Sequence, residues 1–499
     1  MRTENKNISI AILGAGMSGI CMGVQLRAQG YQNFTIFEKA DNVGGTWREN
    51  TYPGVSCDVP SHLYSYSFAR NPDWSRAYSG GAEIQSYCEK IAADYGVTTH
   101  CHFGVTVSKA HYKDGQWHLD FAEEPAPDIQ KQFDVVVTAI GGLHTPAFPD
   151  IKGQADFQGA SFHTAQWNHD IDLTGKKVII IGSAASAVQV VPQIADQLGT
   201  LKVFQRTPNW MFPRINNKIS GFSKSLMRAI PALSWMRRQL IYWRTEYLFH
   251  PAFKENSFMQ KYMRRLALKY LKATVKDDDL RKKLTPDFPL GCKRILFVEG
   301  YLEALQKPNV SLQTQGIEKI TQNGVQDKNG TLHEADVIIY ATGFEPFNFL
   351  DHLSVTNESG VSLKTAWAER ISSHRTVAVT GFPNFFMLLG PNSGLGHSSI
   401  IVMIEAQVHY ILQCLDVISR KGLRRFMPKQ KHQQDFNNRL QDGLKGTVWN
   451  GNCASWYKGG QFGATQENHT IWPFPSRDYV KEMNQLELSE FEHEGNSPD

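Results

Sequence analysis

The sequence predicts an α/β fold with two Rossmann-like domains and an all-α insertion. A short apolar strand, a glycine-rich turn and a helix follow one another twice, first from Ile8 and again from Lys177. From about residue 220 to 284 glycines become rare and apolar residues recur at helical spacing, which is typical of an all-α segment. The chain has 499 residues, 41% of them hydrophobic, which is enough to bury the cores of two or three domains.

The first unit runs from an apolar strand into Gly14-Ala15-Gly16-Met17-Ser18-Gly19, and its second strand ends at Glu38. Glycines at this spacing permit a tight turn and a close approach of pyrophosphate to the helix N-terminus. Glu38 follows these glycines close to the position where an acid grips a ribose hydroxyl in such units. The unit therefore predicts a site for an adenine dinucleotide with a free 2′-hydroxyl group.

The second unit has Gly182-Ser183-Ala184-Ala185-Ser186-Ala187 after its strand, so alanines replace the second and third glycines. This change leaves open an ordinary βα turn without a ligand. Arg206, however, stands as far beyond Gly182 as the acid Glu38 stands beyond Gly14. An acid there repels a 2′-phosphate, whereas a guanidinium binds one in a bidentate manner. FAD at the first unit and NADPH at the second fit this pair of sites.

A third motif, Gly44-Gly45-Thr46-Trp47 and then Tyr52-Pro53-Gly54 up to Asp58, belongs to no dehydrogenase pattern. Two glycines let the backbone approach a ligand closely, because neither has a Cβ atom. Tyr-Pro-Gly favours a turn that aims Asp58 back at whatever the glycines hold. We interpret this stretch as the floor of a flavin site; the alternative is a glycine-rich loop with a capping aspartate.

Composition excludes several other classes of protein. The net charge of +4 gives no support to a nucleic-acid partner. The chain has no stretch of about 18 uninterrupted apolar residues, so we expect no membrane span. The motifs of P-loop proteins and of GxSxG hydrolases are absent from the sequence.

Cysteines and histidines point to no redox pair and no metal. The seven cysteines form an odd set without CxxC spacing, and the start of the chain is short and polar before the first strand. Free thiols and a cytoplasmic location are therefore expected. His100-Cys101-His102 places two histidines on one face of a strand, but no third ligand is in view and we predict no metal site.

Two further stretches carry chemistry-bearing residues. Lys293 and Arg294 precede an apolar run, and the local sequence alone leaves them open as ordinary surface cations. Pro391-Asn392-Ser393-Gly394 precedes a predicted helix over residues 398–415, whose N-terminus is a candidate to face a flavin carbonyl. Trp456, in the aromatic segment 455–457, is a candidate wall of an apolar substrate pocket.

Taken together, these motifs resemble the NADPH-dependent type I Baeyer–Villiger monooxygenases, within the wider class of flavin-containing monooxygenases. The hallmark FxGxxxHxxxW is filled by Phe157, Gly159, His163 and Trp167, and Asn168 departs from the Pro or Asp that follows it. The stretch from Gly44 to Asp58 satisfies the family's second hallmark without a gap. Related enzymes that oxygenate nitrogen or sulfur usually have Phe or Tyr where Trp167 stands, which favours the Baeyer–Villiger branch.

The resemblance implies an activity. NADPH reduces FAD, the reduced flavin reacts with O₂, and a C4a-peroxyflavin attacks a ketone to give an ester or lactone. It also places the active-site arginine at Arg294, paired with and oriented by Asp58, and a phosphate-binding cation at Lys293. His163, with the rest of the fingerprint, is expected to set domain geometry rather than to transfer protons. The candidate cofactor-binding residues are Gly14, Ala15, Gly16, Ser18, Gly19, Glu38, Lys39, Gly45, Thr46, Trp47, Asp58, Tyr64, Val107, Gly182, Ser183, Ala184, Ser186, Gln189, Arg206, Thr207, Lys293 and Arg294.

Two alternatives stay open from the sequence. One is a heteroatom oxygenase that acts on sulfides or amines with the same cofactors, and the other is a non-catalytic flavoprotein that senses NADP(H). The sequence selects neither the ketone nor an oligomeric state. The expected domains are an FAD-binding domain from 1–145 and 380–499, an NADPH-binding domain from 152–215 and 291–342, and a helical insertion from 216–290.

Overall fold

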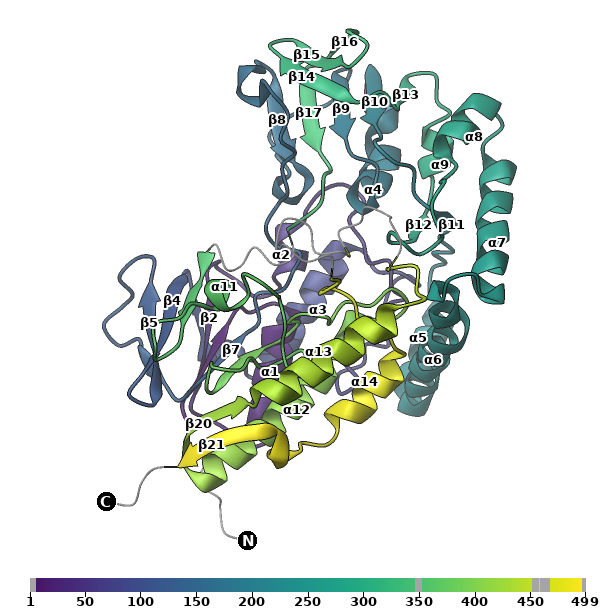
Figure 1. Ribbon diagram of the computed structural model, residues 1–499. Helices are drawn as coiled ribbons and strands as arrows, with labels where there is room; N and C mark the ends of the chain where they lie inside the picture. The colour runs from purple at the N-terminus through teal and green to yellow at the C-terminus, as the bar shows by residue number, and fades with distance from the viewer. Residues whose placement is uncertain (1–5, 346–351, 451–456, 458–466, 496–499) are drawn as a thin grey trace.

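The computed structural model describes residues 6–345, 352–450, 457 and 467–495. Two parallel sheets form the centres of an upper and a lower lobe, and a group of helices lies along one side (Figure 1). The described ends of the chain, near residues 6 and 495, both belong to the lower lobe (Figure 1). The predicted α/β fold with two Rossmann-like units and an all-α insertion is confirmed.

The first sheet has the strand order β19-β7-β1-β2-β3, and every neighbouring pair is parallel. Its strands are β1 (Ile10–Leu13), β2 (Phe34–Glu38), β3 (Cys101–Phe103), β7 (Val135–Thr138) and β19 (Phe385–Met387). All four residues of β1 are buried because both faces of the sheet are covered. Ile10 and Ile12 face one hydrophobic cluster, and Ala11 and Leu13 face another.

Helices cover one face of this sheet and a second sheet covers the other. The helices are α1 (Met17–Ala28), α3 (Gly81–Asp94) and α12 (Ile400–Lys421). The covering sheet has the order β18-β4-β5-β6, with β4 (Val107–Lys113), β5 (Gln116–Phe121), β6 (Gln132–Phe133) and β18 (Ser354–Thr356). Its buried Tyr112 and Trp117 pack on Ala11 and Leu13.

The second parallel sheet has the order β13-β10-β9-β17-β8. Its strands are β8 (Ala160–His163), β9 (Lys177–Ile181), β10 (Thr200–Phe204), β13 (Val310–Gln313) and β17 (Val337–Tyr340). One face packs on α4 (Ala185–Ile194) and α9 (Tyr301–Ala304). The other face meets a small antiparallel sheet of β14 (Ile317–Thr321), β15 (Gly324–Asp327) and β16 (Leu332–Glu334).

The helical insertion follows β11 (Met211–Pro213), which pairs in parallel with β12 (Leu296–Val298) where the insertion ends. It contains α5 (Gly221–Ala229), α6 (Pro231–Arg244), the π-helix η5 (Thr245–Phe249), η6 (His250–Phe253), α7 (Phe258–Thr274) and α8 (Asp278–Leu284). Ser220, Ser257 and Asp277 cap α5, α7 and α8 with their side chains, which explains where these helices begin. Buried Glu246 of η5 accepts a hydrogen bond from His397 at 2.9 Å and so ties the insertion to the first unit.

The C-terminal part returns to the first unit with α11 (Leu363–Ala366), β20 (Leu423–Pro428), α13 (Gln430–Leu444), α14 (Ser476–Met483) and β21 (Phe491–Gly495). The helix predicted over 398–415 is α12, which begins at Ile400 and ends at Lys421. Among the described helices, α12 is the one long and apolar enough to cross a membrane, and 61% of its apolar window is buried inside the protein.

The prediction of free thiols is wrong at one position. Cys21, Cys57, Cys88, Cys101 and Cys414 are free, whereas Cys292 is disulfide-bonded. Sequence spacing did not reveal this because no CxxC motif contains Cys292. No group of three His, Cys, Asp or Glu side chains that could hold a metal ion occurs within the described residues.

Candidate functional site

The first glycine turn joins β1 to α1 and is shaped by contacts that exclude a Cβ atom. Gly14 has φ of +108°, and a Cβ there would lie 2.8 Å from the Ala139 carbonyl oxygen. A Cβ at Gly19 would lie 1.9 Å from the Gly14 carbonyl oxygen. Helix α1 then begins without any side-chain hydrogen bond at its N-terminus, where Ser18 is buried. Such a helix end, with bare N–H groups behind a glycine turn, suits a pyrophosphate.

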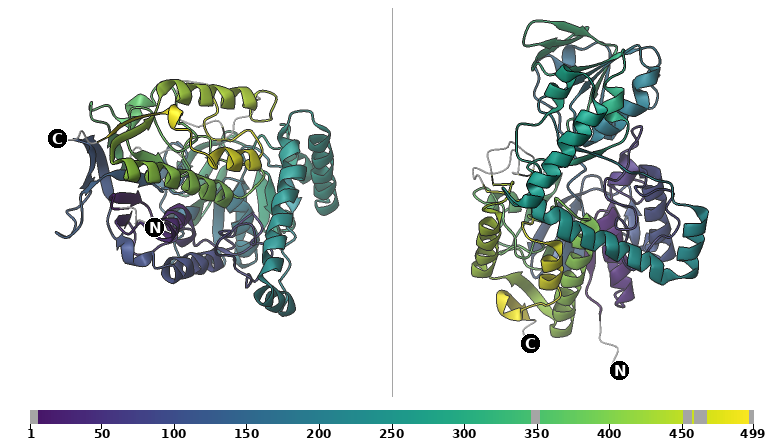
Figure 2. Two further views of the ribbon diagram at one scale, coloured as in Figure 1. Left: turned by 90° about the horizontal axis from the view of Figure 1, so that it is seen from below. Right: turned by 90° about the vertical axis from the view of Figure 1, so that its right-hand side faces the viewer.

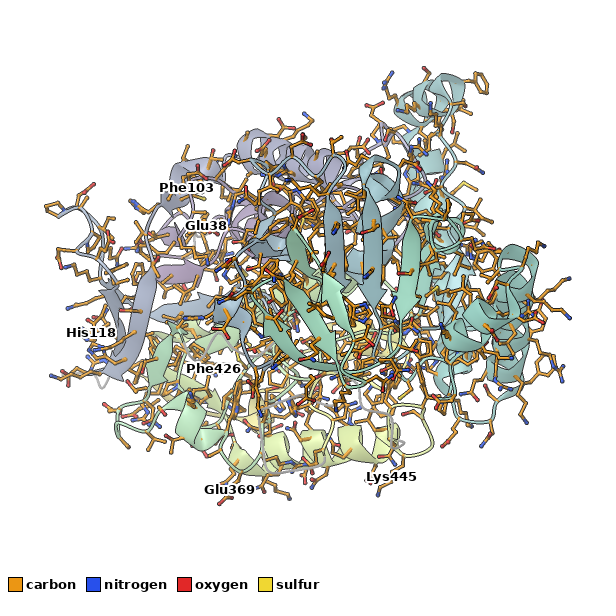
Figure 3. The ribbon with its side chains drawn as sticks, turned by 90° about the horizontal axis from the view of Figure 1, so that it is seen from above. Glu38, Phe103, His118, Glu369, Phe426 and Lys445 are labelled. Carbon is orange, nitrogen blue, oxygen red and sulfur yellow. The ribbon has the colours of Figure 1, made fainter. Side chains whose placement is uncertain are left out.

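Glu38 lies at the carboxyl end of β2, beside this turn. Its carboxylate accepts hydrogen bonds from the Ala15 N–H at 2.8 Å and the Ala40 N–H at 3.1 Å. Glu38 is buried and is the register partner of Phe103 on β3, and Figure 3 labels both residues in the same corner of the molecule. The acid therefore stands where the sequence places it, next to the glycines that would hold the diphosphate.

Gly44 and Gly45 lie against the first glycine turn. The Gly44 N–H donates to the Ala15 carbonyl at 2.9 Å, and a Cβ at Gly16 would meet Gly45 Cα at 3.7 Å. Both residues have positive φ, +120° and +55°, which β-carbon-bearing residues rarely adopt. A small cavity nearby, at the carboxyl ends of β7 and β19, is lined by Thr138, Ile140, Gly141 and residues 387–390. The glycine cradle and the bare helix end supply N–H donors and the acid supplies an acceptor, and together these groups fit FAD.

The other residues predicted at this cofactor surround the cradle. Helix α2 (Thr46–Glu49) starts after Gly45, and the Thr46 hydroxyl donates to the Leu143 carbonyl at 3.2 Å. Trp47 Nε1 donates to the Tyr64 hydroxyl at 3.1 Å. Lys39 is exposed, with Nζ 2.5 Å from His144 Nε2. Val107 is the first residue of β4. The segment just before it is held beside β2, because the Val105 N–H donates to the Glu38 carbonyl.

Asp58 and Arg294, 236 residues apart in the chain, form a bidentate ion pair. Arg294 Nε donates to Asp58 Oδ2 at 2.7 Å and Nη2 donates to Oδ1 at 2.6 Å. The predicted pairing is therefore confirmed. The Arg294 side chain keeps 34% of its surface exposed and Asp58 keeps 22%, so the pair is partly open to solvent.

Electrostatics hold both members of this pair in their charged forms. The Asp58 charge raises the pKa of Arg294 above its usual value, and Tyr457 beside the guanidinium raises it further. Burial raises the pKa of Asp58, but the charge and hydrogen bonds of Arg294 outweigh burial and bring it below the usual value. The site thus contains a fixed cation with an exposed edge.

Arg214 and Tyr457 are neighbours of this pair that sequence reasoning missed. Arg214 Nη1 donates to the Ser56 hydroxyl at 2.7 Å, and Nη2 donates to the Cys57 carbonyl at 3.1 Å. It therefore fixes the loop that presents Asp58. Arg214 directly follows β11, but a lone arginine after a short strand carries no sequence signal for a contact so distant. Tyr457 belongs to the aromatic segment 455–457, in which the sequence indicates only Trp456 as a site residue. Trp456, the predicted pocket residue, lies outside the described residues.

The second glycine turn joins β9 to α4. Gly182 has φ of +112°, and a Cβ there would lie 2.3 Å from the Ala341 carbonyl oxygen. Helix α4 begins after Ala184 with no side-chain hydrogen bond at its N-terminus. The Ser183 hydroxyl lies 3.5 Å from the Thr207 carbonyl oxygen, close to the end of β10. This turn thus repeats the geometry of the first, with alanines at two glycine positions.

Arg206 and Lys293 meet beyond the end of β10. Arg206 is exposed, and burial together with the Arg206 charge lowers the pKa of Lys293. Two cations that repel one another fit a shared anion such as a 2′-phosphate. Lys293 and Arg294 are consecutive in the chain, so the candidate phosphate site lies next to the Asp58–Arg294 pair.

Gln189 of α4 links the second unit to the Asp58 loop. Its Oε1 accepts from the Tyr52 hydroxyl at 2.9 Å, and its Nε2 donates to the Ser56 carbonyl at 2.9 Å. Gly54 packs so closely that a Cβ there would lie 2.5 Å from the Gln189 carbonyl oxygen. Burial raises the pKa of Tyr52 to about 12, and the nearby Ser186 side chain works against that rise. Gln189 and Ser186 therefore contact the loop.

The fingerprint residues lie on and around β8, the edge strand of the second sheet. His163 is fully buried at the end of β8; its Nδ1 accepts from the Ala165 N–H at 3.0 Å. Burial lowers the pKa of His163 to about 4, so the ring is neutral near pH 7. Gly159 has no room for a Cβ, which would lie 2.4 Å from the Asp336 carbonyl, and Trp167 packs edge-on against Phe162 at 5.1 Å. Phe157 contacts the cluster beneath this sheet.

Comparison with known proteins supports a family assignment. The profile of the family described as "FMO-like: Flavin-binding monooxygenase-like" matches residues 6–449. A Baeyer–Villiger monooxygenase of Streptomyces coelicolor is 38% identical over 98% of this chain and 93% of its own. One from Pseudomonas aeruginosa is 38% identical over 94% of this chain and 88% of its own.

Solved structures show the same fold. OTEMO in complex with FAD and NADP superposes with a TM-score of 0.86 at 26% identity, covering 98% of this chain and 99% of that one. Cyclohexanone monooxygenase from Rhodococcus sp. Phi1 bound to NADP⁺ gives a TM-score of 0.86 at 24% identity, with the same coverage. The match extends over both glycine turns, the fingerprint and the Asp58–Arg294 pair, and the chain belongs to the flavin-binding monooxygenase-like family.

Proposed function

We propose that this protein is an FAD- and NADPH-dependent Baeyer–Villiger monooxygenase that inserts one atom of O₂ next to a ketone carbonyl, giving an ester or lactone. The observation that carries the proposal is the bidentate Asp58–Arg294 pair, which joins the flavin-site loop to the Lys293 segment. Relatives named Baeyer–Villiger monooxygenase, alignable over nearly the whole chain, support the reaction. A structural neighbour in complex with FAD and NADP supports the two cofactors.

The first unit would hold FAD through backbone N–H groups of the turn from Gly14 to Gly19, through Glu38 at the ribose and through Gly45. Bound FAD, reduced by NADPH, supplies the activation of O₂, and the protein supplies position and charge. Trp47 and Tyr64, joined by their hydrogen bond, would wall the cofactor.

Arg294 would stabilise negative charge that develops on oxygen during the reaction. A guanidinium does not lose its proton in a protein, so the charge is present throughout the working pH range. Asp58 occupies Nε and Nη2 and Tyr457 also hydrogen-bonds the guanidinium, so its plane is fixed and its exposed edge would face the reacting atoms. One preorganised electrostatic stabiliser of this kind is worth about 10²–10³ in rate.

The second unit would bind NADPH at the Gly182 turn, with Thr207 beside it and with Arg206 and Lys293 on the 2′-phosphate. His163, buried and neutral at the end of the edge strand β8, would act as a positioning residue. We assign residues 1–145 and 380–499 to an FAD-binding domain, 152–215 and 291–342 to an NADPH-binding domain, and 216–290 to the insertion. A cytoplasmic location and a Trp456-lined substrate pocket belong to the same proposal.

Product identity tests the reaction. The FAD-loaded protein is supplied with NADPH and ¹⁸O₂ and offered cyclic and aliphatic ketones, with thioanisole as the heteroatom substrate. We expect NADPH consumption matched by a lactone or ester that carries one ¹⁸O atom. Sulfoxide without ester would assign the protein to the heteroatom oxygenases. Tight cofactor binding without NADPH consumption on any substrate would indicate a non-catalytic sensor.

Arg294→Ala separates the role of the cation from cofactor reduction. We expect stopped-flow traces to show flavin reduction by NADPH within about threefold of wild type, and ester formation to fall at least about 10²-fold. Arg294→Lys keeps a charge but loses the bidentate geometry, so its ester formation should lie between the two. Normal ester formation by the alanine variant would remove Arg294 from the mechanism.

A further inference from the structure

The helical insertion exposes apolar side chains that the proposed reaction does not use. Of the 18 large hydrophobic residues that are exposed in the described chain, 12 lie between residues 221 and 266. Phe222 on α5 is 79% exposed, Leu240 on α6 is 72% exposed and Phe258 on α7 is 77% exposed. Concentration of such residues on one segment marks a surface that binds something.

Most of the exposed apolar residues of each helix share one face; Trp235 and Leu248 lie to either side of the face on α6 and its continuation. On α6 and its continuation, Met236, Leu240, Trp243 and Tyr247 follow at intervals of three and four, and the rings of Trp243 and Tyr247 stack at 5.6 Å. On α5 the spacing is Phe222, Leu226, Ile230, and on α7 it is Phe258, Tyr262, Leu266. The three helices lie together on the right of Figure 1 and on the face turned to the viewer in the right-hand view of Figure 2.

The same segment is strongly basic. Residues 218–276 contain 13 Lys and Arg against two acids, a net charge of +11, while the whole chain carries +4, so the remainder carries −7. One of the two acids, Glu246, is buried and paired with His397, which leaves Glu255 as the one exposed acid there. Nearly all the exposed charge of residues 218–276 is therefore positive, and exposed acids of the insertion follow at Asp277, Asp278 and Asp279, at the start of α8.

Basic and apolar residues share a face on α7. Lys261, Arg265 and Lys269 each lie three positions after Phe258, Tyr262 and Leu266, and the helical repeat places all six on one exposed surface. This mixture of aromatic, aliphatic and cationic side chains is what a helix needs to lie in the headgroup region of an anionic bilayer. Aromatic rings sit at the level of the headgroups, while the lysine and arginine stems reach the phosphates.

We propose that the insertion binds the surface of an anionic phospholipid bilayer, with α5, α6 and α7 (the insertion surface) lying in its plane. The positive charge of this surface favours a bilayer over a second copy of the chain. In a dimer, a surface with a net charge of +11 would repel an identical surface. At a negatively charged leaflet, each Lys or Arg near the surface instead contributes favourable binding free energy. Binding would be peripheral, and it would place the enzyme beside the phase in which apolar ketones concentrate. The proposal extends the proposed function and does not depend on it, because lipid binding is measured without turnover.

Vesicle co-sedimentation tests this directly with the FAD-loaded full chain. The two vesicle types are pure phosphatidylcholine and a mixture of phosphatidylcholine with phosphatidylglycerol at about seven to three, which is negatively charged. We expect the wild type to partition at least about tenfold better onto the mixed vesicles and to be released as NaCl rises. Phe222→Ser/Leu240→Ser/Phe258→Ser and Lys261→Glu/Arg265→Glu/Lys269→Glu should each lose at least about tenfold in partitioning. Ketone-driven NADPH consumption without vesicles serves as the control for folding.

Matched controls carry the same chemical changes elsewhere on the surface. Leu332→Ser/Val361→Ser and Lys109→Glu/Lys319→Glu/Lys328→Glu should bind vesicles as the wild type does. Wild-type protein that stays in the supernatant with both vesicle types overturns the proposal, as does equal binding by the insertion variants. A dimer seen by light scattering that both insertion variants convert to monomers, with no vesicle binding, would assign the insertion surface to self-association instead.

Discussion

The two glycine turns share one backbone geometry but differ in what surrounds them. Gly14 and Gly182 have nearly equal φ values, +108° and +112°, and each packs against the carbonyl oxygen of the residue that directly follows a neighbouring strand, β7 or β17. The acid that follows the first turn, Glu38, is buried and hydrogen-bonded to Ala15 and Ala40. The cation that follows the second, Arg206, is exposed. The first site is thus assembled inside the protein, and the second is open at its surface.

This difference matches the two tasks of the proposed enzyme. A cofactor that stays through many turnovers is best held by a site whose parts are fixed before it binds, since less ordering remains to oppose binding. A hydride donor that must enter and leave is served by exposed cations, which attract it and let it dissociate. The test of this comparison is whether equivalent changes in the two turns have different consequences.

The largest effect is expected at the third glycine of the first turn. Gly19 corresponds to Ala187 of the second turn, since each ends the six-residue turn that begins with Gly14 or Gly182. A Cβ at Gly19 would lie 1.9 Å from the Gly14 carbonyl oxygen, which is backbone and cannot move aside cheaply. Such overpacking costs about 1–3 kcal/mol.

We therefore expect Gly19→Ala to raise the dissociation constant of FAD at least about tenfold. Titration of the apoprotein with FAD measures this dissociation constant. The amount of flavin that stays bound to the protein after gel filtration is a second measure. The reverse change Ala187→Gly is the matched control and should leave FAD binding unaltered. Full FAD occupancy in Gly19→Ala would mean that the first turn tolerates what the second one does.

A smaller, more selective effect is expected at Arg206. A charge-assisted hydrogen bond is worth about 1.5–3 kcal/mol, and exposure of Arg206 to solvent puts its contact at the lower end of that range, so Arg206→Ala should raise KM for NADPH about tenfold. KM for NADH should stay nearly unchanged, because NADH has no 2′-phosphate. Lys293→Ala should show the same direction with a smaller factor. Steady-state kinetics with both nucleotides measure these KM values. Equal increases in KM for NADPH and NADH would contradict the assignment of Arg206 to the 2′-phosphate.

Much of the fold was predictable because its signals are local. Strand, glycine turn and helix follow one another directly along the chain, and the buried strands are continuous apolar runs. The caps of α5, α7 and α8 are similarly local. The contact of Asp58 with Arg294 spans 236 residues and came from family resemblance, since no local pattern encodes it.

What escaped prediction depends on distant packing. Arg214 reaches the Asp58 loop from the end of β11, and Gln189 reaches it from α4. The strand β18, between the predicted parts of the two domains, joins β4 from a much earlier part of the chain and pairs Ser354 with Lys109. The disulfide at Cys292 is another long-range feature that spacing does not reveal. Such contacts follow from how whole units pack, which periodicity within one segment does not specify.

The smallest of these effects concerns His163, where the second unit joins the first. Its ring is fully buried, and burial lowers its pKa to about 4, below the usual value of about 6.5. Between these two pH values the His163 ring is protonated in the unfolded chain and neutral in the folded protein. The contribution of His163 to the free energy of unfolding therefore falls as pH drops from about 6.5 to 4 and is constant above that range.

His163→Asn removes this titration and keeps an acceptor for the Ala165 N–H. Allowing for solvent screening, we expect the loss of stability between about pH 7.5 and about pH 5 to shrink by about 1–2 kcal/mol relative to wild type. His62, which is buried, and His250, which is half-buried, also have pKa values lowered by burial, and the variant and the wild type both keep these two contributions to the pH dependence. Urea denaturation at the two pH values measures the change, with exposed His169→Asn as the control. Parallel curves for His163→Asn and wild type would mean that the ring is hydrated in solution, and the proposal that His163 acts as a buried, neutral positioning residue would have to be abandoned.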